Sequence, residues 1–368
     1  MRGSTSPPVP RVRFLLAVAA LSGCANADSE QASDTGSAPG TPVSALDVTA
    51  LDGFWRVLDT LSADLEPSDR LWDELLATPA YRALTESEFP PTYFPESFRL
   101  AFKPSLADSL AAALEGNGRG RRLGHYLQVA ERRTEIVAFV EQLRSSDVMD
   151  RASRLTATWL PVPVPERPAP VALAVFDLDA RGYDPIVVDP LAARQLDLLL
   201  FLAHESHHWY RNARAAIDWG SVPEHDADLL WTLYQVQGEG IADQIDKRPW
   251  LDGGEAPPPA RSSYVEAYLA ALADTPSVLR ELDALLVAWG DTSDPEERRA
   301  IGARASDLVP LSGHPTGYFM ARTILDTLGR ERLVADVANP ARFFRTYDEA
   351  ARASGDTGLS EAALTSLD

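Results

Sequence analysis

The sequence predicts a mainly α-helical protein with a small β-sheet (α+β), and two observations lead to this fold class. Apolar residues recur at helical spacing through most of the chain, beginning with Phe54, Val57 and Leu58. Short runs of β-branched and apolar residues, typical of strands, stand at 171–176 and 185–188. At 368 residues, the chain is long enough to bury a full hydrophobic core.

The N-terminal residues have the composition of a bacterial targeting segment. Three arginines within residues 1–13 form a positive n-region, and residues 14–21 form a short apolar h-region. The letters LSGC, ending at Cys24, resemble a lipobox, and Cys24 is the one cysteine of the chain. We therefore expect a signal peptide over residues 1–23, cleaved before Cys24, and a lipid on that thiol. The alternative is a soluble secreted protein in which Cys24 is incidental.

Five regions are expected along the chain. After the signal peptide, residues 24–45 are rich in Ser, Asp, Gly, Thr and Pro without a hydrophobic period, which indicates a flexible tether. A helical N-terminal region then covers residues 46–160. A core that holds the small sheet and two functional helices covers residues 161–250, and a helical C-terminal region covers residues 251–368.

The charge of the chain limits its partners. The formal net charge is −20, and removal of the arginine-containing signal peptide makes the mature form more acidic. This balance argues against nucleic-acid binding and against electrostatic docking on anionic lipid. We expect a monomer in the bacterial cell envelope, on the periplasmic or extracellular face, that meets the membrane only through the lipid anchor at Cys24.

Local signals place the individual elements. Proline-rich segments at 88–97 and 161–170 predict a loop and an extended linker. The strands 171–176 and 185–188 are expected to pair through a turn around 180–183 and to lead into an apolar helix. Apolar periodicity predicts further helices over 45–84, 105–114, 123–143 and 227–246, and Asp294-Pro295 predicts the start of another.

The apolar helix after the strands carries an H-E-x-x-H motif, His204-Glu205-Ser206-His207-His208. On a helix, His204 and His208 lie one turn apart on one face and can reach one metal ion. Glu205 is placed where it can hold the water that completes the coordination shell. His207 is rotated from these histidines by about 100° on the helix, so we assign it a structural role. The alternative is that both histidines are ordinary half-buried residues.

A zinc ion held by two histidines needs another protein ligand, and Glu239 is the preferred candidate. It lies in a helical pattern, and glycines flank it on both sides, which suits a close approach of two helices. Asp243 follows four residues later on the same face, where it could accept a hydrogen bond from a ligating histidine. Glu224, Asp226 and Asp228 are weaker candidates, and Glu239 as a surface acid is the alternative.

Together, His204-Glu205-x-x-His208 and Glu239-x-x-x-Asp243 resemble the gluzincin metallopeptidases, of which thermolysin is the familiar member. The local sequence, with strands before the motif and E-G-x-A-D after it, is more similar to bacterial zinc-dependent peptidases of uncharacterised families. The resemblance covers about residues 171–246. It implies a zincin-like fold with additional helical parts at both ends, and an edge strand beside the metal that binds extended substrate. The G-x-M-E-N stretch of the aminopeptidase branch is absent, as is the substrate-strand signature of thermolysin.

The same resemblance implies a zinc-dependent metallopeptidase with one Zn²⁺ per chain. His204, His208 and Glu239 would hold the ion, and Glu205 would act as general base on water. The oxyanion of the reaction needs a further donor, and Tyr318 and His314 are the candidates. Peptides or proteins are the expected substrates.

Two other functional classes remain open. The chain could be a catalytically inactive zincin-like lipoprotein that binds a peptide or a partner, although the metal and base positions are all present. The motif could also be accidental in an all-helical binding protein. The metal content of the protein separates these hypotheses most directly.

Overall fold

The computed structural model describes residues 46–116, 118–164, 168–214, 217–254, 256–257 and 262–367. This part of the chain is mostly helical with one small sheet, so the predicted fold class is confirmed. The expected signal peptide, the tether and Cys24 lie outside the described residues. Among the described helices, none combines the length and apolarity needed to cross a bilayer.

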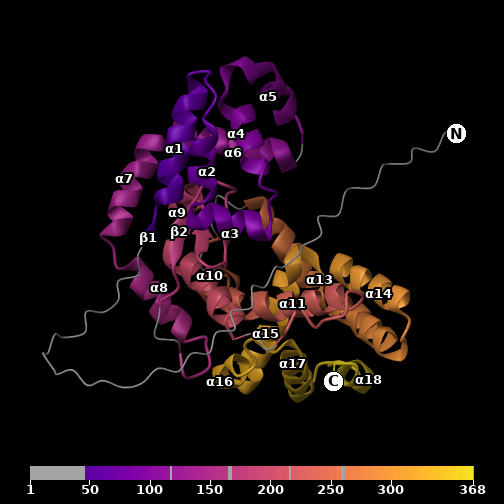
Figure 1. The fold of residues 1–368 in the computed structure, drawn as a ribbon. Helices are drawn as coiled ribbons and strands as arrows, with labels where there is room; N and C mark the ends of the chain where they lie inside the picture. The colour runs from indigo at the N-terminus through magenta and orange to yellow at the C-terminus, as the bar shows by residue number, and fades with distance from the viewer. Residues whose placement is uncertain are drawn as a thin grey trace, which may run out of the picture.

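The chain begins with helices, enters the sheet, and returns to helices until its C-terminus (Figure 1). The elements are, in order, β1 (Leu46–Asp47), α1 (Thr49–Ser62), α2 (Asp69–Leu76), α3 (Pro79–Ser87), α4 (Tyr93–Phe102), η1 (Pro104–Leu106), α5 (Ala107–Leu114), α6 (Gly118–Glu131), α7 (Arg133–Arg144), α8 (Val148–Ala157), β2 (Val171–Leu173), β3 (Ala180–Arg181), β4 (Ile186–Val188), α9 (Pro190–Gln195), α10 (Leu198–Asn212), α11 (Ala227–Asp246), α12 (Arg248–Leu251), α13 (Ser262–Asp291), α14 (Pro295–Leu308), η3 (Pro310–Gly313), α15 (His314–Leu328), α16 (Arg330–Val334), α17 (Pro340–Ser354) and α18 (Glu361–Thr365).

The predicted helical segments are helical, but the single helix predicted over 123–143 is wrong, because α6 begins at Gly118 and is separated from α7 at Arg132. The helix predicted over 227–246 is α11, and Asp294 caps α14 by accepting a hydrogen bond from the Glu296 amide at 2.9 Å. The loop predicted over 88–97 is wrong in its second half, because α4 begins at Tyr93. Pro95 lies in the first turn of α4, where a missing amide hydrogen breaks no helical hydrogen bond.

The sheet has the strand order β1-β2-β4-β3. The strands β1, β2 and β4 run parallel, with Val171 opposite Ile186, and β3 pairs antiparallel with β4 at the edge. Every residue of β2 and β4 is buried, as is usual for parallel strands covered on both faces.

The predicted pairing of 171–176 with 185–188 through a turn is therefore wrong in topology. The hairpin partner of β4 is the short strand β3, which was expected to be the turn itself. Only 171–173 of the first segment is a strand, and it lies parallel to β4. Local β-propensity marks apolar segments, but it does not decide which segments pair or in which direction.

Helices α10 and α11 occupy the middle of the molecule (Figure 1). In this view, α1 to α7 lie at one end and α14 to α18 at the other. Helix α10 packs against α8 and α11, and α11 packs against α14 and α15. One hydrophobic cluster contains residues of the N-terminal helices, the sheet and the C-terminal helices. The two central helices are therefore covered by elements from all parts of the described chain.

A buried ion pair attaches α6 to the start of α9. Nε2 of His125 lies 2.8 Å from Oδ2 of Asp189, and both side chains are almost fully buried. The other carboxylate oxygen of Asp189 caps α9 by accepting hydrogen bonds from the amides of Leu191 and Ala192. Burial lowers the pKa of His125, but the hydrogen bond and charge of Asp189 outweigh it and raise that pKa above 6.5. His125 is thus a buried packing residue that joins two helices.

We expect His125→Leu to destabilise the fold in a pH-dependent manner. Because the folded pKa of His125 is raised, its contribution is fully present below pH 6.5 and is lost as the pH rises through the folded pKa. Urea denaturation with a chelator present should show a loss of about 3–5 kcal/mol below pH 6.5 and a smaller loss at higher pH. His225→Leu, at a half-exposed histidine, is the control. An equal loss for His125→Leu at all pH values would contradict this assignment.

Candidate metal centre

Helix α10 presents the H-E-x-x-H motif from a buried position. Asp197 caps the helix by accepting a hydrogen bond from the Leu200 amide at 3.1 Å. On the side of α8, the Thr156 hydroxyl donates to the carbonyl oxygen of Ala203 at 3.0 Å. These contacts fix the start and the middle of α10, so that His204 and His208 both face α11.

The structure brings His204, His208 and Glu239 together as a candidate metal site. The Nε2 atoms of the two histidines lie 3.0 Å apart. Oε2 of Glu239 lies 3.1 Å from Nε2 of His208 and 3.5 Å from Nε2 of His204. The three side chains are at most 12 % exposed.

The chemistry of this donor set fits a zinc ion. Oε2 of Glu239 is buried and has no hydrogen-bond partner among the described residues, although two imidazole nitrogens face it. Burial raises the pKa of Glu239, but the charges of His208 and His314 outweigh it, so the pKa lies well below 4.5. A buried carboxylate that faces two imidazoles is satisfied by a divalent cation, and three such ligands leave one position open.

Glycines allow the helices of the centre to approach closely, as their positions beside Glu239 predicted. A Cβ atom on Gly238 would lie 2.5 Å from the guanidinium carbon of Arg211 on α10. A Cβ atom on Gly240 would lie 2.3 Å from the carbonyl oxygen of Gly317 on α15. Both distances are far below van der Waals contact, so a larger residue at Gly240 would push α11 away from the backbone of α15, and one at Gly238 would displace the Arg211 side chain.

Arg211 accompanies this contact as a buried cation. Its Nε donates to Oε1 of Gln237 at 2.9 Å, its Nη2 donates to the carbonyl oxygen of Tyr234, and its guanidinium lies over the Tyr234 ring. Burial lowers the pKa of Arg211 to about 10, against the opposing effect of Tyr234 and Glu239. No sequence pattern distinguished Arg211 as a buried cation beside the motif.

A ligating histidine was expected to donate a hydrogen bond to Asp243, but His204 lies closer to Asp246. Nδ1 of His204 lies 3.0 Å from Oδ1 of Asp246 and 3.6 Å from Oδ1 of Asp243. Asp246 was missed, although it lies seven residues after Glu239 and hence on the same face of α11. The nearer spacing of four residues was preferred, but the crossing of α10 over α11 brings His204 closer to the later turn.

Asp243 instead holds other groups beside the centre. Nδ1 of His314 lies 3.0 Å from both of its oxygens, the Tyr268 hydroxyl donates to Oδ2 at 2.9 Å, and the Lys247 ammonium lies 2.6 Å from Oδ1. His314 opens α15 and also lies 3.2 Å from Oε2 of Glu239, so it joins the candidate centre.

Tyr318, the other predicted donor, does not join the centre. Its hydroxyl donates to Oδ2 of Asp252 at 2.8 Å, and its side chain is fully buried. Tyr318 lies one helical turn beyond His314 on α15, and its ring points toward Asp252 in the segment after α12. Two tyrosines of α13 lie near His314 instead: the ring centroid of Tyr264 lies 6.4 Å from that of His314, and the Tyr268 hydroxyl donates to the carbonyl oxygen of His314 at 3.4 Å. No sequence motif distinguished Tyr264.

Glu205 is a residue of α10, and its carboxylate lies beside Gly182, the residue that follows β3. A Cβ atom on Gly182 would lie 2.6 Å from Cβ of His208 and 3.4 Å from Oε2 of Glu205, so the edge strand abuts the motif. Burial raises the pKa of Glu205, against the opposing charges of His204 and His208. His207 is outside every candidate ligand group and is fully buried, and burial lowers its pKa well below 6.5.

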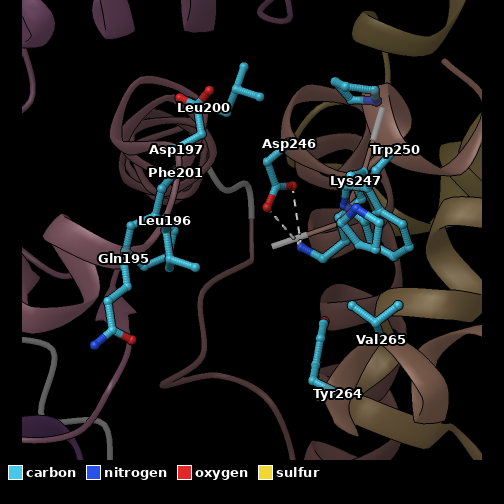
Figure 2. A pocket seen from close by; sticks show the side chains of 13 residues that line it. Gln195, Leu196, Asp197, Leu200, Phe201, Asp246, Lys247, Trp250, Tyr264 and Val265 are labelled. Atoms are coloured by element: carbon cyan, nitrogen blue, oxygen red, sulfur yellow. Dashed lines mark hydrogen bonds and ion pairs between the residues drawn. The ribbon is translucent and has the colours of Figure 1, made fainter. Parts of the chain in front are cut away.

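A cavity of about 450 Å³ adjoins the centre (Figure 2). Leu196, Leu200 and Phe201 form one wall at the start of α10, and Trp250 lies opposite. Asp246, whose Oδ1 lies 3.0 Å from Nδ1 of His204, is one of the residues that line this cavity. The cavity is thus bordered by Asp246, the residue that orients the candidate ligand His204.

Comparisons with known proteins agree with this geometry. The model of a family described as "Putative zinc dependent peptidase (DUF5700)" matches residues 72–356, which cover the strands β2 to β4 and the helices α10, α11 and α15. Neither the curated proteins nor the solved structures gave a match.

We expect Gly240→Ala to destabilise the fold by about 1–3 kcal/mol, because the added Cβ atom meets the backbone of Gly317. It should also weaken zinc binding, because α11 carries Glu239. Gly124→Ala is the matched control, since its Cβ atom has space within α6 and gains helix propensity of up to about 1 kcal/mol. Urea denaturation of both variants is the measurement. A neutral Gly240→Ala would contradict the close packing of α11 on α15.

Proposed function

The chain belongs to the family described as "Putative zinc dependent peptidase (DUF5700)", and from this premise we propose that it is a metallopeptidase. The observation that carries the proposal is the buried convergence of His204, His208 and Glu239 beside Glu205. These residues would hold one zinc ion. When bound, zinc lowers the pKa of a water molecule and polarises the scissile carbonyl group.

Glu205 is the proposed general base. It is not one of the candidate ligands, and it lies one residue after His204 on the side of β3. Because burial raises the pKa of its carboxylate, Glu205 is a stronger base than an exposed glutamate. It would accept a proton from water and later donate that proton to the departing amine.

His314 is the proposed donor to the oxyanion. Burial lowers its pKa, but the charges of Asp243 and Glu239 outweigh it and favour the protonated ring. A protonated imidazole donates through both nitrogens, and Asp243 holds only Nδ1. Tyr264, which packs against this ring, replaces Tyr318 as the tyrosine to examine.

The edge strand β3 supports a peptide as the substrate. In the described sheet β3 pairs with β4 on one side and is the last strand in the order. An extended peptide can add to such an edge through main-chain hydrogen bonds. The residue after β3, Gly182, lies beside Glu205, so a peptide on this edge would pass the general base.

We expect the purified full chain to contain about one zinc ion, because the candidate ligand groups share His204, Glu239 and Asp243 and so lie at one place. Glu239→Ala should lower the zinc affinity by more than the 10- to 100-fold that is typical when a ligand loses its hydrogen-bonding partner. Elemental analysis and chelator competition measure both effects. Glu224→Ala, an exposed acid that was a weaker ligand candidate, is the control. A folded wild type that takes up no zinc would refute the proposal.

Glu205→Gln separates a peptidase from a zinc-containing binding module. The variant keeps the shape of the side chain but cannot accept a proton, so hydrolysis of casein or a peptide panel should fall by about 10²- to 10⁴-fold. Zinc content should stay the same, because Glu205 is not a ligand. Glu141→Gln, on the exposed face of α7, is the control for activity. Unchanged hydrolysis by Glu205→Gln would exclude Glu205 as the base, whereas two zinc-loaded but inactive proteins would favour the binding module.

A further inference from the structure

A buried ammonium group lies beside the centre at the end of α11. The chain has 34 lysine and arginine residues in total, and only two of them, Lys103 and Lys247, are lysines. The Lys247 side chain is only 5 % exposed, whereas Lys103 forms a surface ion pair with Glu66 at 3.5 Å. Lysine is therefore rare in this protein, and one of its two positions is in the interior next to the candidate metal site.

Lys247 is shared by two carboxylates. Its Nζ lies 2.6 Å from Oδ1 of Asp243, and 3.1 Å and 3.2 Å from the two oxygens of Asp246. Figure 2 shows the contact with Asp246 at the wall of the cavity. A compact ammonium with three donors can serve two carboxylates that approach from different directions, whereas a guanidinium is a planar fork that suits one.

Each of these carboxylates holds a different histidine. Asp246 accepts from Nδ1 of His204 at 3.0 Å, and Asp243 faces Nδ1 of His314 at 3.0 Å. A hydrogen bond at Nδ1 sets the tautomer and the ring orientation and leaves Nε2 free for its own partner. One ammonium therefore contacts both carboxylates, and through them it is linked to His204, a candidate ligand, and to His314, the candidate oxyanion donor.

The charges explain why the ammonium is needed. Asp243 and Glu239 are buried, Asp246 beside them is 17 % exposed, and a carboxylate in such surroundings is strongly destabilising without a compensating charge. Without Lys247, an aspartate would be neutralised by a proton or would turn away, and either change alters the hydrogen bond to its histidine. Burial lowers the pKa of Lys247, but Asp243 and Asp246 raise it well above 10.5, so the group stays charged at neutral pH.

We propose that Lys247 is a positioning residue that sets the orientation of His204 and His314 together through one shared ammonium. The roles of these histidines as ligand and oxyanion donor rest on the proposed function. The shared orientation does not, because it can be measured in metal-free protein. The proposal predicts that loss of Lys247 displaces both histidines and that a replacement ammonium restores both.

The cavity makes such a replacement possible. Lys247 lines the cavity of about 450 Å³, so Lys247→Ala leaves a space that a small alkylammonium ion can enter. Propylammonium supplies the ammonium and most of the missing side chain. A purely structural lysine would not be rescued in this way at both histidines.

The first measurement is the ¹⁵N NMR spectrum of the histidine rings in the metal-free full chain, which has six histidines. In Lys247→Ala, we expect the Nδ1 signals of both His204 and His314 to shift, and saturating propylammonium to return both. Lys103→Ala should leave all signals in place. Wild-type signals for either histidine in Lys247→Ala would overturn the proposal. If the alanine variant does not fold, Lys247→Met fills the same space without charge and is judged by the same two signals.

The second measurement is zinc affinity by chelator competition, with peptide hydrolysis alongside. Lys247→Ala should bind zinc about 10- to 100-fold more weakly and regain affinity with propylammonium. At saturating zinc, kcat should fall more than KM changes, because His314 is also displaced. Wild-type zinc affinity and kcat in Lys247→Ala would overturn the positioning role while leaving the peptidase intact. Weakened zinc binding without hydrolysis by any variant would support the positioning role and refute the peptidase.

Discussion

The constraint on which the structure depends is the burial of several charged and polar side chains between α10 and α11. His204, Glu205 and Glu239 lie in an interior where a carboxylate without a cation is costly. A divalent ion would satisfy the face where His204, His208 and Glu239 meet. Lys247 already satisfies the opposite face, where two aspartates converge. With a metal ion bound, the two sides of the centre would thus have two different cations.

This burial requires the helices to lie unusually close. The glycines of α11 remove the Cβ atoms that would hold α10 and α15 apart, and Gly317 does the same on α15. Helices α8 and α9 and strand β4 then pack on α10, while α14, α15 and α17 pack on α11. Elements from both sides of the motif in the chain therefore enclose two helices whose facing sides are polar.

The edge of the sheet connects this centre with the surface. Strand β3 follows a bend in the chain and ends at Gly182 against the motif helix. A hairpin of the two apolar segments, as the sequence suggested, would have placed no short edge strand there. The observed topology supports a peptide route past Glu205, and lipid anchorage at Cys24 stays a prediction because that residue lies outside the described chain.

The sequence by itself determined the features that depend on neighbours along one helix. The i, i+4 spacing of His204 and His208, the limits of α11 and the choice of Glu239 all follow from local periodicity and flanking glycines. Only the tertiary structure decided that Asp246 rather than Asp243 holds His204, that Tyr318 turns to Asp252, and that β2 pairs parallel with β4. These outcomes depend on how separate elements cross, and the crossing is set by packing across the whole core rather than by the spacing of residues within any one element.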